Sequence, residues 1–216
     1  MARHFTTILW IIGSLLVISL LGFYKTYFRF FPHFESTNWV VHFHVITILC
    51  WFTMLVAQGW LAKSGRIEQH RSMGRLSYFL APIIVVGFIL VTNVGQLKHK
   101  DTGLFGATFF DGGLFVVLYI LGIINRKNTD FHSRYMILTA LPFINPGLGR
   151  FIGPEVSLPV EFLLIIAFLV TAYVKKKPYK PYLVGLGAFF LLLGFVVYIS
   201  LIDPTIIESI WIAFWG

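Results

Sequence analysis

Four histidines border long apolar segments in this sequence of 216 residues. His70 and His132 lie at matching ends of two such segments, and His44 and His99 lie at the opposite ends of two others. A b-type haem is held by two axial imidazoles at the same depth, and one haem near each face of a membrane would let electrons cross it. The pattern predicts an inner haem between His70 and His132, with His44 as the best outer ligand.

Each inner histidine is followed closely by an arginine, namely Arg71 and Arg134. A guanidinium group is planar and binds carboxylates through two hydrogen bonds. We therefore expect Arg71 and Arg134 to neutralise haem propionates. The apolar segment at 104–124 contains no histidine, which counts against the outer haem because His99 would have to ligate it from outside that segment.

A metal ion is a second interpretation of the outer residues. His44, His99, Asp101 and Asp111 fall on the same predicted side, and imidazole and carboxylate ligands together suit zinc, iron or another divalent metal. No HExxH, HxxxH or Cys-His motif occurs in the sequence. The metal assignment of His44, His99 and Asp111 therefore depends on how the helices pack.

Two carboxyl groups interrupt the apolar pattern. Asp111 lies about two turns inside its segment and is followed by Gly112 and Gly113, and Glu161 lies just after Pro159. An ionisable group inside a membrane is costly and is a functional candidate for that reason. The alternative is that each carboxyl is neutralised by a proton or pairs with a base such as Arg150.

The histidines also have a purely structural interpretation. The segment 68–75 resembles a loop, with Ser72 as N-cap of the next helix, and Asp130 would similarly cap a helix with His132 in its first turn. His70 and His132 would then be interfacial anchors or hydrogen-bonding partners between loops. His44 shares a seven-residue stripe with Trp51 and Gln58, so we expect it to point into the bundle.

The composition determines which elements can position these residues. Apolar residues make up 57% of the chain, charged residues 12%, and the mean hydropathy is +0.82. These values exclude a soluble enzyme, a disordered protein and a disulfide-built secreted module. The net charge of +8 is explained by membrane topology, so we expect no nucleic-acid partner.

We predict an all-α membrane protein with seven transmembrane helices in a single domain over 1–216. The spans are Phe5–Tyr24, Trp39–Ala62, Leu76–Leu97, Leu104–Ile124, Tyr135–Ile152, Leu158–Val174 and Tyr182–Ile202. The first is expected to be a retained helix rather than a cleaved signal peptide. The fifth contains Pro142, Asn145 and Pro146, and it should kink or unwind near its end.

The distribution of Lys and Arg predicts the orientation. With a cytoplasmic N-terminus, twelve of the 17 basic residues fall inside and five outside, so the C-terminus is expected outside. Residues 205–216, with Trp211 and Trp215, are too short to cross and should lie along the outer interface. The single cysteine, Cys50, is expected to be a small core residue.

Short motifs support a family resemblance. His70-Arg-x-x-Gly74 opens one span and His132-x-Arg-x-Met136 opens a later one, with His44 and Gln58 upstream. In this order the motifs resemble a group of uncharacterised bacterial multi-pass membrane proteins, over roughly residues 38–152. The resemblance implies an inner-membrane location but no reaction. A more distant likeness, to two-haem cytochrome b561-type proteins, rests on the number of helices and the paired histidines.

Three functions follow from these observations. The first is a membrane redox protein with haem b as its cofactor. The second is an accessory or assembly subunit of a larger membrane complex, which the small size and short loops favour. The third is a metal-binding protein or membrane enzyme that uses His44, His99 and Asp111. In each case the expected surroundings are a lipid bilayer, with complex subunits as further partners.

Overall fold

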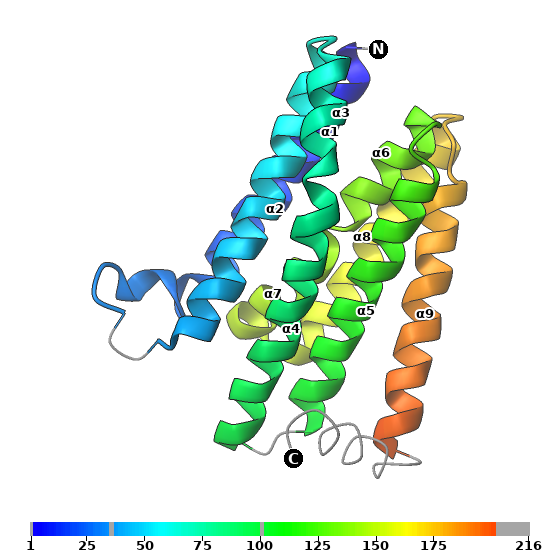
Figure 1. The fold of residues 1–216 in the computed structure, drawn as a ribbon. Coiled ribbons are helices and arrows are strands. Elements are labelled where there is room, and N and C mark those ends of the chain that lie inside the picture. Colours follow the sequence, from blue (N-terminus) through cyan, green and yellow to red (C-terminus); the bar gives the residue numbers. More distant parts are fainter. Residues whose placement is uncertain (1, 35–36, 100–101, 202–216) are drawn as a thin grey trace.

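The computed structural model describes the backbone of residues 2–34, 37–99 and 102–201, and the side chains of 5–34, 37–92, 106–153 and 155–201. Within these ranges the chain is helical and contains no strand, which confirms the all-α class (Figure 1). The elements are α1 (Ala2–Tyr24), η1 (Phe28–Phe30), α2 (Trp39–Lys63), α3 (Ile67–Arg75), α4 (Ser77–His99), α5 (Thr102–Ile124), α6 (Thr129–Leu138), η2 (Leu141–Phe143), α7 (Asn145–Ile152), α8 (Pro154–Val174) and α9 (Lys180–Leu201).

Six helical stretches in the described part of the chain are long and apolar enough to cross a membrane. They are Phe5–Tyr24, Trp39–Lys63, Ile67–Thr92, Gly106–Ile124, Glu155–Val174 and Lys180–Leu201. These stretches correspond to the first four and the last two predicted spans. Large apolar side chains such as Trp10, Leu163 and Leu191 are exposed on their outer surfaces, as contact with a lipid bilayer requires.

The fifth predicted segment is not one continuous helix. It is divided into the end of α6, the short 3-10 helix η2 and α7. Pro142 and Pro146 have no amide hydrogen, so neither can donate the bond that would continue an α-helix through 138–146. The predicted interruption is confirmed, but it lies in the middle of the segment rather than near its end.

The interrupted segment lies in the centre of the bundle. Its fully buried side chains, each 1% exposed or less, are those of Leu138, Thr139, Ala140, Leu141, Phe143 and Ile144. A backbone that departs from helical geometry at membrane depth must be shielded from lipid, since lipid offers it no hydrogen bonds. The surrounding helices provide this shielding.

Two helix starts differ from the sequence prediction. Residues 67–75 form α3, so Ser72 lies inside a helix and is not an N-cap, and His70 does not precede the helix. The N-cap of α6 is Asn128, whose side-chain oxygen accepts a hydrogen bond from the Phe131 amide at 3.2 Å. Asp130 is in the first turn instead. The cap of α6 therefore lies two positions before the predicted one, whereas Arg66, the N-cap of α3, makes no side-chain capping bond.

The loops gather at two ends of the molecule (Figure 1). The start of α1, α3, the α5–α6 loop and the α8–α9 loop lie at one end, which we call the upper end as drawn. Segment 25–38, which includes η1, and the end of α9 lie at the lower end. Burial raises the pKa of the Tyr27 phenol in this segment, and its hydroxyl lies 2.7 Å from His42 Nδ1.

Small residues let α7 approach α1 closely. A side chain at Gly22 would come within 2.6 Å of the Gly147 backbone, so these two helices touch main chain to main chain.

Cys50, by contrast, is exposed on the surface of α2. The prediction that it is a core residue was wrong, because Trp51 and Phe52 take the inward positions there, each with no exposed surface.

Candidate functional site

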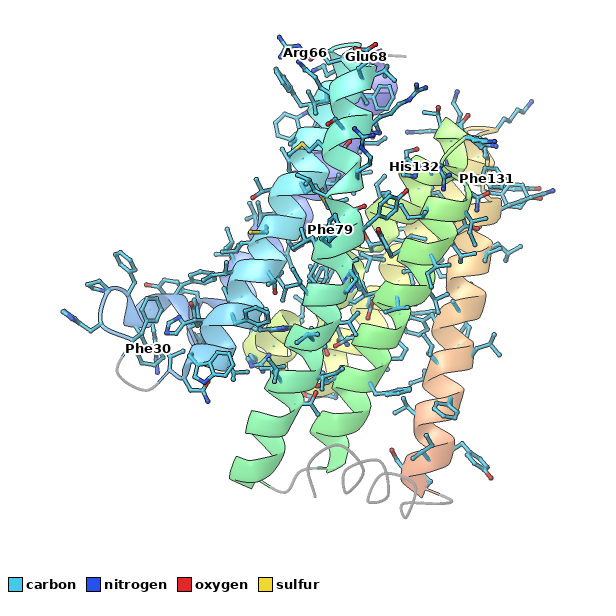
Figure 2. The ribbon with its side chains drawn as sticks, viewed as in Figure 1. Phe30, Arg66, Glu68, Phe79, Phe131 and His132 are labelled. Atoms are coloured by element: carbon cyan, nitrogen blue, oxygen red, sulfur yellow. The ribbon has the colours of Figure 1, made fainter. Side chains whose placement is uncertain are left out.

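Two groups of polar side chains lie inside the bundle. The histidine pair, His70 and His132 with Gln58 beside them, is near the upper end. The carboxyl cluster, which we define as Asp111, Asn145, Arg150 and Glu161, lies on α5, α7 and α8. Figure 2 places His132 and Phe131 at the same end of the molecule as Arg66 and Glu68, and far from Phe30 in the lower loop.

His70 is held on α3 by a reciprocal contact with Gln58 of α2. The Gln58 amide nitrogen donates to the His70 carbonyl at 3.0 Å, and His70 Nδ1 lies 3.2 Å from the Gln58 carbonyl. A carbonyl oxygen only accepts hydrogen bonds, so Nδ1 must carry the proton. The other ring nitrogen, Nε2, is then free to bind a ligand while the imidazole is neutral.

His132 has the same arrangement on α6. Its Nδ1 lies 2.9 Å from the carbonyl of Gly122 on α5, so this nitrogen also donates and Nε2 is free. The two imidazole centres are 6.3 Å apart and their planes are nearly perpendicular, at 81°. The fold therefore brings together the two histidines that the sequence paired, from helices 62 positions apart in the chain.

A backbone carbonyl that accepts from Nδ1 is the usual outer partner of a metal-bound histidine, because it fixes the tautomer and the ring orientation. A metal ion ligated at about 2 Å by two such rings on opposite sides holds their centres about 6 Å apart. The observed separation of 6.3 Å fits this requirement. The pair thus has the donor atoms, the tautomers and the spacing of two ligands to one metal.

The number of ligands favours haem over a bare ion. Where the structure describes side chains, it contains no group of three or more histidine, cysteine or carboxylate residues that could hold a metal. Structural zinc takes four protein ligands and catalytic zinc takes three. Haem iron already has four ligands from its macrocycle and needs only two axial residues. Two histidines are thus the number of protein ligands that a six-coordinate haem iron takes.

The two arginines differ in their surroundings. Arg71 is exposed next to His70. Arg134 is buried, and its Nη1 donates to both the carbonyl and the carboxylate of Asp130, the latter at 2.7 Å. Arg134 Nε is buried without a hydrogen-bond partner. Arg71 is therefore the arginine available to an added carboxylate, whereas Arg134 is already paired.

His44 points into the bundle as its stripe predicts, and only 9% of it is exposed. Its ring centre is 5.1 Å from that of Phe88, and its buried Nδ1 has no hydrogen-bond partner. A side chain at Gly87 would come within 3.1 Å of that nitrogen. The side chains of His99 and Asp101 lie outside the described residues, so the outer haem and the outer metal site stay predictions. Segment 205–216 also lies outside the described residues.

The carboxyl cluster connects residues that the sequence considered separately. Asn145 donates to the Asp111 carboxylate at 2.9 Å, which joins α7 to α5. Glu161 interacts electrostatically with Asp111, and so does Arg150. Sequence reasoning offered Arg150 as a partner for either carboxyl but did not bring Asp111, Asn145 and Glu161 together, since nothing in the hydropathy pattern shows that these three helices meet.

Comparison with protein-family models, curated proteins and solved structures finds no match to this chain. The fold and the site therefore define the class directly. The described part of the chain is helical, and six of its helices are long and apolar enough for a multi-pass membrane location.

Proposed function

We propose that this chain is a membrane redox protein that holds a b-type haem between His70 and His132. The observation that carries the proposal is the anchoring of both Nδ1 atoms to backbone carbonyls, at 3.2 and 2.9 Å, with the ring centres 6.3 Å apart. Neither Nε2 takes part in these hydrogen bonds, so both remain available as ligand atoms.

A bound haem would supply one-electron transfer. The residues of this chain that would hold it are His70 and His132, whose tautomers are fixed by the carbonyls of Gln58 and Gly122. Arg71, which is exposed and follows His70 on α3, would bind a propionate. Arg134 would do so only by exchanging its contact with Asp130.

The same proposal includes the topology. The α6–η2–α7 segment begins after the upper end of α5, and it ends beside the lower end of α1, where Lys25 lies over the Phe151 ring and Arg150 over Phe23. We infer that this interrupted segment is the seventh crossing. Basic residues are concentrated at the upper end, so this end faces the cytoplasm, with the N-terminus inside and the C-terminus outside. The motif resemblance indicates that the membrane is a bacterial inner membrane.

The test is a reduced-minus-oxidised visible spectrum of the protein purified in mild detergent from its native membrane. We expect a sharp α-band and a shifted Soret band at about one haem per chain. His132→Ala and His70→Ala should each remove this haem. His33→Ala is the matched control, because His33 is exposed in the lower loop and should leave the haem content unchanged.

Full haem content in folded His132→Ala protein would contradict the ligand assignment. A flat spectrum from folded native protein would contradict the redox function itself. Co-purification of fixed partners without a chromophore would then indicate an accessory subunit, and bound zinc or iron lost on Asp111→Ala would indicate the outer metal site.

A further inference from the structure

Asp111 and Glu161 are the most deeply buried charged residues in the described part of the chain. Asp111 is 1% exposed and Glu161 is completely buried, although both are on helices long and apolar enough to cross a membrane. Two negative charges at this depth would repel each other and would both lose their hydration. The surroundings must therefore neutralise at least one of them.

The hydrogen-bond partners of the two carboxyls differ sharply. Asp111 accepts one hydrogen bond, from the Asn145 amide. Both carboxyl oxygens of Glu161 are buried without any partner. A buried carboxylate with two unsatisfied oxygens is much more costly than a neutral carboxylic acid in the same place, because the charged form depends on hydrogen bonds that are absent.

The positive groups nearby do not compensate for both charges. Arg150 of α7 interacts electrostatically with Asp111 and with His44 of α2. It forms no ion pair, however, because the one ion pair within the described residues is Arg134–Asp130. Arg150 is itself exposed, and its Nη1 donates to the Pro146 carbonyl at 2.8 Å. His44 has an unpartnered Nδ1 and sits against Phe88 in an apolar position that favours the neutral imidazole.

We propose that Asp111 and Glu161 form a proton-binding site inside the membrane, in which the two carboxyls together carry at least one proton near neutral pH. Asn145 stabilises charge on Asp111 by donating to it, so Glu161 is the residue that holds the proton. This inference is independent of the haem and concerns different helices.

The experiment is infrared spectroscopy of the purified full-length protein, because a protonated carboxyl absorbs at a frequency distinct from that of a carboxylate. Near neutral pH the native protein should show a carboxylic acid band. Glu161→Gln should remove the intensity of one carboxyl from it. Glu155→Gln is the matched control, because Glu155 is exposed on the same helix and should leave the band unchanged.

Asp111→Asn keeps the size of the side chain and removes its charge. In this variant the Glu161 band should persist, because Glu161 loses no hydrogen bond. If instead Asp111→Asn removes the band and Glu161→Gln does not, the proton is on Asp111 and the assignment to Glu161 is overturned. A native protein with no band that either variant removes would overturn the whole proposal, since both carboxyls would then be ionised and held by a bound cation.

Discussion

Trp51 shows how one polar atom is accommodated at the centre of this apolar bundle. The side chain has no exposed surface, and its indole N–H donates to Thr139 Oγ1 at 3.1 Å. Thr139 in turn donates to the Met136 carbonyl at 2.7 Å. The contact joins α2 to the interrupted segment after α6, so one hydrogen bond stabilises the place where helical bonding is lost.

We expect Trp51→Phe to lower the stability of the folded protein by about 1–3 kcal/mol, because it removes a buried hydrogen bond and leaves a small cavity. The measurement is thermal unfolding in detergent. Trp10→Phe is the control, because Trp10 is 75% exposed and makes no comparable contact with the core. Equal stability of the two variants would show that the Trp51–Thr139 bond contributes nothing measurable.

At the scale of the elements, the close approach of α1 and α7 decides how the interrupted segment is held. Gly22 and Gly147 face each other across this contact, with no room for a methyl group between the two backbones. Contact between small residues is a common way to pack helices in membranes, where van der Waals attraction replaces much of the hydrophobic effect. α1 thus supports α7 and, through it, Asn145 and the carboxyl cluster.

Gly22→Ala should therefore destabilise the protein by about 1–3 kcal/mol, because the added methyl group must push two rigid helices apart. Gly13→Ala in the same helix is the matched control, since a side chain there would meet nothing within 4 Å. That variant should be as stable as the native protein, or slightly more stable through its higher helix propensity. Unfolding in detergent compares the two, and a silent Gly22→Ala would contradict the packing of α1 on α7.

For the whole molecule, the number of crossings depends on the α6–η2–α7 segment alone. If the segment crosses, the chain has seven spans and its two termini lie on opposite sides of the membrane. If it does not cross, α8 and α9 are inverted and the basic α8–α9 loop changes sides. The proposed crossing keeps the basic loops together on one side, as the preference for positive charge inside requires.

Single cysteines on a Cys50→Ala background test this directly. Lys127→Cys in the α5–α6 loop should react with an impermeant maleimide only after the membrane is opened, and Glu155→Cys at the start of α8 should react in intact cells. Both native residues are exposed. Arg66→Cys and Lys25→Cys serve as references for the inner and outer side, because both positions precede the tested segment and are exposed. Labelling of positions 127 and 155 from the same side would contradict the crossing.

The sequence alone was sufficient for the features that depend on local composition. The lengths of the apolar segments predicted seven spans, six of which correspond to membrane-compatible helices, and the prolines at 142 and 146 predicted the interruption of the other. The seven-residue stripe correctly turned His44 and Trp51 inward. These properties follow from helix periodicity and from missing amide hydrogens, which are local to the chain.

The contacts between helices were decided only by the tertiary structure. The 6.3 Å separation of His70 and His132, the bond from Asn145 to Asp111 and the burial of Glu161 without a partner all depend on which helices are neighbours. In an apolar bundle nearly every helix face is hydrophobic, so hydropathy does not specify the packing order. Cys50 was misplaced for the same reason. Close packing of small and aromatic residues specifies these neighbours, and that complementarity exists only in three dimensions.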